Sequence, residues 1–474
     1  MRQRVKHWCL ILIRNLQCQW SEISMQREES LAEKLRKYTA SGIYPMHMPG
    51  HKRNVPICIK DLLCDIYSID VTEVEGTDNL HQAEGIILQA MQYAAKVYGA
   101  RDTFFLVNGS SGGILSAMHC CSRKKKKVLM TPGAHISAYH GLELFGLEPI
   151  FVDTEYFEDI GITAGLNPEK VMEKIREQKD EFAFVYVTSP TYEGVILQVR
   201  EIADIAHAHH IPLIVDEAHG AHLHFLKQEQ NFSALDCGAD LVIQSVHKTL
   251  PSLTQTAILH IQGEMISRDE MERSLTFFET SSPSYILMSA IDGAIRYMDE
   301  MGKKKLAQLW EWQQEFRAQI GKLNYVFCWN PGQDKTKYIA GIDQTKLVLG
   351  AKINGESMFG EQLQEILRRD YAIETEMSGV EYTLAMLTVG DDKEGIDRLL
   401  NAMKDIDWRI HKGEIVCWPR EEITLSLFVG DRAHHFVYAY PPDIPILRPG
   451  EIVSEEKIEI IKRYLRSHCH IVGL

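Results

Sequence analysis

The chain has 474 residues, and its 65 acidic residues outnumber its 51 basic residues to give a net charge of −14. This length, with 45% hydrophobic and 24% charged residues, is typical of a globular protein with a large core and two or three domains. The negative charge argues against a nucleic-acid partner, and no apolar run approaches the ~20 residues that cross a membrane. Ten cysteines without CxxC spacing indicate reduced thiols and a cytoplasmic location.

The N-terminus begins with a basic stretch, and an apolar run follows over residues 8–13. That run is too short for a signal peptide, Arg14 interrupts its continuation, and no small-residue cleavage site follows. We therefore expect residues 1–24 to form an extension outside the fold. Residues 25–70 form an N-terminal segment, in which apolar residues at helical spacing predict a helix over residues 28–40.

Short apolar strands then alternate with helices. The predicted helices cover residues 83–98, 114–121 and 201–209, and the predicted strands cover residues 103–107, 128–130, 182–188, 213–216 and 240–243. This alternation predicts an α/β fold with a mostly parallel sheet covered on both faces, and we assign residues 71–300 to this large domain. Ligands bind such sheets at the carboxyl ends of the strands.

The sequence pattern changes near residue 300. A charged segment over residues 296–317 predicts one long helix. The elements expected beyond it are strands at 345–349 and 383–389 and a helix at 359–370. Residues 301–474 are therefore expected to form a smaller α+β C-terminal domain.

Two of the predicted strands are followed or ended by residues that could act in catalysis. Asp216 ends one strand, and Ser245-Val246-His247-Lys248 follows the next. A lysine amine can form a Schiff base with the aldehyde of pyridoxal 5'-phosphate (PLP), and a carboxylate can pair with the pyridinium nitrogen and keep it protonated. Either residue alone is a common structural feature, but together they indicate a PLP site with Lys248 and Asp216 as catalytic residues.

A glycine- and serine-rich segment, residues 109–113, lies between a predicted strand and a predicted helix. Here Gly112 lets the backbone approach a phosphate, Ser110 and Ser111 offer hydroxyls, and the helix N-terminus offers free N–H groups. The alternative is an ordinary tight turn. After the next strand, His135 could stack on the cofactor ring.

His219, His222 and His224 form a cluster that also suggests zinc. Their spacing fits no usual ligand pattern and a fourth ligand is missing, so we expect no metal site.

The ordered motifs resemble those of a known family. Their positions are residues 47–52, 76–81, 109–113, 190–194, 216–219, 245–248, 281–285, 440–442 and 444–451. Together the motifs resemble those of PLP-dependent Orn/Lys/Arg decarboxylases of fold type I, in the short form that lacks the N-terminal wing domain. The resemblance covers about residues 28–474, and it implies an aminotransferase-like large domain with a smaller C-terminal domain.

The resemblance also implies roles for individual residues. It makes Lys248 the Schiff-base lysine, Asp216 the pyridinium partner and His135 the ring-stacking residue. The phosphate ligands that it implies are Ser110, Ser111, Ser245 and His247. The segment 281–285 is similar to one that reaches the neighbouring subunit's site, which implies a homodimer with shared active sites.

The sequence departs from the family pattern at three places. His219, expected among the cofactor contacts, stands where some wing-bearing relatives carry Trp. Asp443 replaces the usual glycine after two prolines, and residues 431–436 do not match the expected pattern. These departures bear on which substrate is bound, because the last segment is expected near the distal end of the substrate.

The implied reaction is α-decarboxylation of arginine, lysine or ornithine, which would feed polyamine metabolism. Another fold type I enzyme, an aminotransferase or aldolase, and a catalytically silent regulatory relative are the alternatives. Aminotransferases usually hold the α-carboxylate with a late arginine, and Arg448 is the only late arginine in a recognisable motif. Intact Lys248 and Asp216 argue against a silent relative.

A basic side chain on the substrate requires an acid in the site, because an unpaired buried charge is costly. Asp78 and Glu75, in an acid-rich loop at residues 70–81, are the predicted substrate contacts. The alternative is that these acids cap the helix that follows or lie in solvent.

Overall fold

The computed structural model describes residues 30–474, except for 57–58, 61–64, 158–159, 179–180, 227–231, 333–336, 420–422, 424, 441–443 and 468–469. The predicted extension over residues 1–24 and the departure at Asp443 lie outside the described residues. The chain divides into two compact units, residues 1–43 and residues 44–474. Among the described residues, no helix is long and apolar enough to cross a membrane.

The described part of the first unit contains helix α2 (Leu31–Thr39), which lies within the predicted helix. A capping box fixes its start, because the Ser30 hydroxyl accepts a hydrogen bond from the Glu33 amide and the Glu33 carboxylate accepts one from the Ser30 amide.

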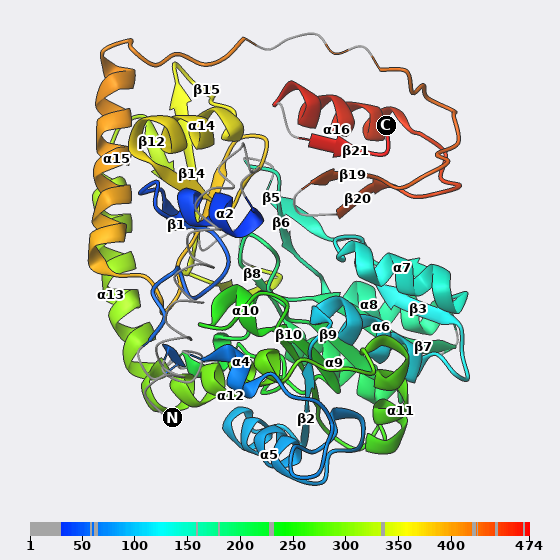
Figure 1. Cartoon of the computed structure of the whole chain (residues 1–474). Coiled ribbons are helices and arrows are strands. Elements are labelled where there is room, and N and C mark those ends of the chain that lie inside the picture. Colours follow the sequence, from blue (N-terminus) through cyan, green and yellow to red (C-terminus); the bar gives the residue numbers. More distant parts are fainter. Residues whose placement is uncertain are drawn as a thin grey trace, which may run out of the picture. The chain divides into compact units, whose positions relative to one another are not determined.

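A seven-stranded sheet forms the core of the second unit (Figure 1). Its strands, in spatial order, are β2 (Asp102–Leu106), β11 (Ala257–Ile261), β10 (Leu241–Ser245), β9 (Leu213–Asp216), β7 (Phe182–Thr188), β3 (Lys127–Met130) and β4 (Glu148–Phe151). Strand β11 runs antiparallel to both β10 and β2, and the other neighbouring strands of this sheet pair in parallel. Every residue of β9, β10 and β11 is buried, so both faces of the sheet are covered.

Helices connect and cover these strands. They are α4 (Ile66–Ile69), η1 (Leu80–Gln82), α5 (Ile86–Tyr98), α6 (Gly109–Cys121), α7 (Ile136–Phe145), α8 (Pro168–Glu177), α9 (Val199–Ala208), η2 (Leu223–Phe225), α10 (Val246–Thr249), α11 (Arg268–Phe278) and α12 (Tyr285–Tyr297). Helix α6 contacts β2, β10 and β11, and α9 contacts β9. The short strands β5 (Glu155–Phe157) and β6 (Ile162–Gly165) pair with each other, and β8 (Val195–Leu197) pairs with β13 (Ile339–Ile342).

A second, antiparallel sheet follows in sequence. It contains β12 (Val326–Cys328), β14 (Lys346–Ile353), β15 (Glu356–Ser357), β17 (Met377–Ser378) and β18 (Thr383–Met386), with helices α13 (Lys303–Ile320), α14 (Gly360–Tyr371) and α15 (Lys393–His411). Figure 1 shows α13 and α15 side by side. Strand β1 (Tyr44–Met46) pairs with β16 (Ile373–Thr375), so a segment from the N-terminal part of the chain joins this region.

A third sheet lies near the C-terminus. Strands β20 (Ile444–Leu447), β19 (Val437–Tyr440) and β21 (His470–Val472) form it, together with helix α16 (Glu455–Arg466).

The predicted α/β class with a mostly parallel sheet is confirmed, one local prediction is wrong, and a second is correct in type but too short. The segment 109–113 is the first turn of α6 rather than a separate turn, because only Gly109 has a positive φ, +74°. The predicted helix at 296–317 is the later part of a longer helical run, in which a π-helical segment η3 (Met298–Gly302) joins α12 to α13. The proposed domain boundary at residues 300/301 falls within η3.

Candidate active site

The carboxyl ends of neighbouring strands bring the predicted residues together. Asp216 is the last residue of β9, and in register it faces Thr188, the last residue of β7, and Ile243 of β10. Strand β10 ends at Ser245 and leads directly into α10, which carries Lys248. The order of strands in the sheet therefore places the acid and the lysine on adjacent strand ends.

Lys248 contacts His219. Its Nζ lies 3.0 Å from His219 Nε2. His219 is only 5% exposed, and its burial, followed by the positive charges of Lys248 and Lys346, holds its pKa well below the usual range. The imidazole is therefore neutral near pH 7, and its Nε2 can accept a hydrogen bond from the lysine ammonium. The His219 ring also lies 4.4 Å, between centroids, from the ring of Tyr192.

Asp216 is 2% exposed and is held by two contacts. Its Oδ1 accepts a hydrogen bond from the Ala218 amide at 3.1 Å, and its Oδ2 accepts one from the Tyr186 hydroxyl at 3.3 Å. Burial, followed by the Asp216 charge, raises the pKa of Tyr186 well above its ordinary value, so the phenol remains a donor. A carboxylate offers about four lone-pair positions, so Asp216 can accept a further N–H.

The predicted phosphate ligands come from two strand ends. The Ser110 hydroxyl at the start of α6 lies 2.6 Å from the Ser245 hydroxyl at the end of β10. Ser111 is exposed. A Cβ at Gly112 would meet Glu279 Oε1 at 2.9 Å, so the glycine also leaves room for that carboxylate.

His247 is also among the predicted phosphate ligands. Its Nδ1 lies 2.9 Å from the Thr256 carbonyl, to which it donates. Burial lowers the pKa of His247 to about 4, so the other ring nitrogen, Nε2, carries no proton near pH 7. A phosphate dianion beside the ring would raise this pKa, and Nε2 would then become a donor.

His135 is the N-cap of α7, and its ring is fixed by its own helix. Nδ1 accepts a hydrogen bond from the Ser137 amide at 3.2 Å and lies 2.8 Å from the Ser137 hydroxyl. The three histidines of the 219–224 cluster have different partners, because His219 contacts Lys248, His224 contacts Asp236 and His222 contacts Asp343. No group of three or more metal-ligating side chains occurs within the described ranges.

Of the two predicted substrate acids, Asp78 is bonded to the backbone. The Asp78 carboxylate accepts hydrogen bonds from backbone amides at the start of α5, at Glu84 (3.0 Å), Gly85 (2.8 Å) and Ile87 (2.9 Å). Glu75 is exposed. These contacts match the capping alternative for Asp78.

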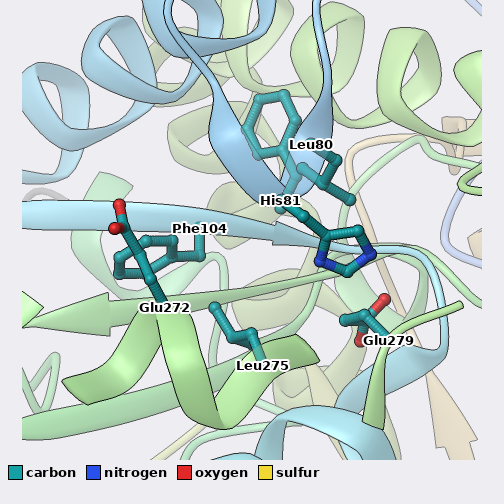
Figure 2. Close-up of a pocket in the computed structure, with 7 residues that line it drawn as sticks. Leu80, His81, Phe104, Glu272, Leu275 and Glu279 are labelled. Atoms are coloured by element: carbon teal, nitrogen blue, oxygen red, sulfur yellow. The ribbon is translucent and has the colours of Figure 1, made fainter. Parts of the chain in front are cut away.

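A small pocket is lined by side chains of η1, β2 and α11 together with Glu279, and Figure 2 shows these side chains. Glu279 points into it beside His81, and Glu272 lies on the opposite side. The Glu279 Oε2 atom accepts hydrogen bonds from the amides of Val107 and Asn108, at 2.9 and 3.0 Å. Glu279 therefore anchors the segment that leads into Ser110.

Two residues near Lys248 carried no signal in the sequence. Glu376 accepts hydrogen bonds from the Tyr192 hydroxyl at 2.6 Å and from the Met48 amide at 2.7 Å. Lys346 begins β14 and is fully buried. Its position before an apolar strand is typical of a solvated strand end, and only the tertiary structure shows that its side chain lies inside.

The strand ends fit the PLP site that the sequence predicts. Asp216 has capacity for a ring nitrogen, and the paired serines offer hydroxyls at a helix N-terminus. The buried Thr188 Oγ1 and His219 Nδ1 atoms have no hydrogen-bond partner among the described residues. Buried polar atoms are normally paired, so these two atoms are suited to a ligand.

Solved structures share this fold. A lysine decarboxylase from Francisella novicida superposes with a TM-score of 0.73 at 15% identity, covering 95% of this chain and 85% of the other. The constitutive lysine decarboxylase of E. coli superposes with a TM-score of 0.70 at 17% identity, covering 93% of this chain and 79% of the other. The sheet and its strand-end residues define fold type I, the fold of a large class of PLP-dependent enzymes.

Sequence relatives show to which family within this class the chain belongs. The family described as "Orn/Lys/Arg decarboxylase, major domain" matches residues 30–395. An arginine decarboxylase from Bacillus subtilis is 30% identical over 473 residues, covering 94% of this chain and 96% of the relative. The chain belongs to the Orn/Lys/Arg decarboxylase family, and it is an amino-acid decarboxylase.

Proposed function

We propose that this protein uses PLP to remove the α-carboxyl group of arginine, lysine or ornithine, and that the resulting amine enters polyamine metabolism. The observation that carries the proposal is the presence of Lys248 and the buried Asp216 at adjacent strand ends. The Bacillus subtilis relative, named for arginine, supports a basic substrate.

The roles of the side chains follow from their contacts. When bound, PLP supplies an electron sink through its protonated pyridinium ring. Asp216 would hold the proton on the ring nitrogen, and His135 would cover one face of the ring. Lys248 would bind the cofactor covalently, and the neutral His219 at 3.0 Å can accept a hydrogen bond from its amine and so orient it.

We further propose that the phosphate is held by the first turn of α6 together with the end of β10. Ser110 and Ser245 supply hydroxyls, and Ser111 and Gly112 supply backbone N–H groups at the helix N-terminus. His247 joins them once the phosphate charge has raised its pKa.

Three acids are candidates for the group that binds the basic side chain of the substrate. Asp78 and Glu75 are the acids predicted from the sequence. Glu376 is a third candidate, because its carboxylate bonds to the hydroxyl of Tyr192, whose ring lies against His219.

We propose a homodimer in which residues 281–285 contribute to the neighbouring active site. In this segment Ser281 and Ser282 are exposed, whereas the Tyr285 hydroxyl is tied to the Asp78 carbonyl at 2.8 Å. A cytoplasmic location is proposed from the cysteine pattern, and Cys120, Cys121 and Cys328 form no disulfide.

One contact disfavours an aminotransferase. The Arg448 guanidinium donates to Glu451 at 3.0 Å and lies 4.0 Å over the ring of Phe151. This guanidinium is therefore already engaged by an acid and an aromatic ring. An aldolase or a silent relative is tested directly by product analysis.

The test is to incubate the protein and PLP with each of the three amino acids and to identify the amine by mass spectrometry. We expect one of them to give its amine together with a cofactor absorption band that borohydride fixes. A keto acid product, or no product from any of the three, would contradict the proposal.

A further inference from the structure

Lys346, the first residue of β14, is a fully buried cation. Its side chain has no exposed surface, and within the described ranges Nζ has no hydrogen-bond partner. The nearest carboxylate oxygen in an ion pair with it, Asp343 Oδ2, lies 4.0 Å away. This distance allows attraction but no hydrogen bond, and an ammonium ion without acceptors is costly to bury.

Asp343 is held mainly by other groups. Its Oδ1 accepts hydrogen bonds from the Thr345 hydroxyl at 2.7 Å and the Thr345 amide at 3.0 Å, and lies 3.2 Å from His222 Nε2. The acid is therefore fixed by its neighbours, and Lys346 is not needed to hold it in place.

The side chain of Lys346 passes beside the loop that follows β7. A Cβ at Gly194 would meet Lys346 Cγ at 2.8 Å, and Gly194 has a φ of +97°, which favours glycine. The same loop carries Tyr192, whose ring lies against His219. The positive charges of both Lys346 and Lys248 lower the pKa of His219, so both cations lie within electrostatic range of its ring.

The missing partner of such a cation is an anionic oxygen. The cofactor and the substrate both have such oxygens. The residues that fit the cofactor come from the seven-stranded sheet and the helices that follow its strands, whereas Lys346 comes from β14 of the second sheet. The position of Lys346 on the second sheet therefore favours the substrate, rather than the cofactor, as the source of the anionic oxygen.

We propose that the Lys346 ammonium binds the α-carboxylate of the amino-acid substrate, an inference that rests on the proposed function. A single ammonium holds a carboxylate less firmly than the two-pronged guanidinium of an arginine. Weak binding suits this reaction, because the carboxylate must leave as neutral CO₂, and tight binding of the charged group would stabilise the ground state.

The protonation of Lys346 supports this role. Burial lowers its pKa to about 8, against the opposing charges of Asp343 and Glu376. The amine is therefore mostly charged at pH 7 and can bind an anion.

The test compares two ligands that differ only in the carboxylate. PLP-loaded wild type, Lys346→Met, Lys346→Arg and Asp343→Asn are mixed with the amino acid and, separately, with its product amine. Stopped-flow absorbance of the cofactor band gives each dissociation constant before turnover. Titration of each apo-protein with PLP gives the cofactor affinity.

For Lys346→Met we expect the amino acid to bind at least about tenfold more weakly and the amine to bind within about twofold of wild type. Arginine should restore part of the loss, and Asp343→Asn should keep the ratio between the two ligands. Equal weakening of both ligands, a loss confined to PLP binding, or the same ratio change in Asp343→Asn would overturn the inference. A wild type that binds both ligands but forms no amine contradicts the proposed function instead.

Discussion

Asp78 lies before helix α5, and Lys346 is the first residue of strand β14. Both residues are charged, but they differ in whether the charged atoms form hydrogen bonds. Asp78 Oδ1 accepts hydrogen bonds from the amides of Asn79 and Glu84, and Oδ2 accepts them from Gly85 and Ile87. Lys346 Nζ donates no hydrogen bond to a described residue. The described residues supply hydrogen-bond donors to the Asp78 carboxylate, but they supply no acceptor to the Lys346 ammonium.

This difference separates structural from ligand-binding charges. A carboxylate whose lone pairs are filled by backbone amides stabilises the fold and has little capacity left for a ligand. A buried group without a partner destabilises the fold unless a ligand pairs with it. The comparison predicts that changes near Lys248 alter activity, whereas changes at Asp78 and Glu279 alter stability.

The largest effect is expected for Lys248→Ala. This variant should show no measurable decarboxylation and no cofactor band that borohydride fixes, because the amine that binds the cofactor is absent. Mass spectrometry of the amine and absorbance measure both properties, and circular dichroism should show an intact fold. Substantial turnover by this variant would contradict the role of Lys248.

Asp216→Asn should retain bound PLP but lose most of its activity. The amide can still bond to the ring nitrogen, but it cannot stabilise the positive charge there. Tyr186→Phe is the matched control, because it removes only the 3.3 Å hydrogen bond to the same carboxylate and should reduce kcat by about fivefold or less. If Asp216→Asn turns over at nearly the wild-type rate, another residue pairs with the pyridinium.

Much of this arrangement could be predicted from the sequence. The apolar runs at 182–188 and 213–216 are buried strands with the predicted bounds. A strand that is covered on both faces is a continuous apolar run, so its first and last residues can be recognised in the sequence. The closeness of Asp216 and Lys248 followed from parallel strands whose carboxyl ends share one edge.

Other features depend on contacts that are distant in sequence. The segment 109–113 contains three glycines, which disfavour helix, yet it is helical because Gly113 packs tightly against Leu106 and Ile243. Lys346 is buried by the loop at Gly194, which lies far away in the chain. No local pattern contains this information.

Glu279→Gln should change how stability depends on pH. Burial raises the pKa of Glu279 from 4.5 to about 7, so the folded state holds a proton that the unfolded state releases. The contribution of this group to stability is therefore complete below about pH 4.5 and is lost as the pH rises to about 7. The glutamine variant does not lose this contribution. Between about pH 4.5 and 7 its free energy of unfolding should therefore rise relative to that of the wild type, by at most about 3 kcal/mol.

Urea unfolding between pH 4 and pH 8 measures this difference. Glu272→Gln, at an acid on the same pocket that pairs with Arg268 at 2.8 Å, controls for the general loss of a negative charge. An unchanged difference between Glu279→Gln and wild type across the pH range would show that Glu279 does not titrate there.

Asp78→Asn tests whether the Asp78 carboxylate stabilises the fold rather than binding the substrate. Asparagine keeps one acceptor oxygen but replaces the second with an amide that cannot accept the bonds from Gly85 and Ile87. We expect the free energy of unfolding to fall by about 1 kcal/mol, as for other helix caps, and KM to stay within about twofold of wild type. Asp78 would instead be a substrate contact if KM for the basic amino acid rose about tenfold while stability was unchanged, because a hydrogen bond to a charged group contributes ~1.5–3 kcal/mol.

Glu376→Gln, measured beside Asp78→Asn, shows whether the acid bonded to Tyr192 recognises the substrate's charge. If it does, loss of the carboxylate should raise KM without a comparable loss of stability.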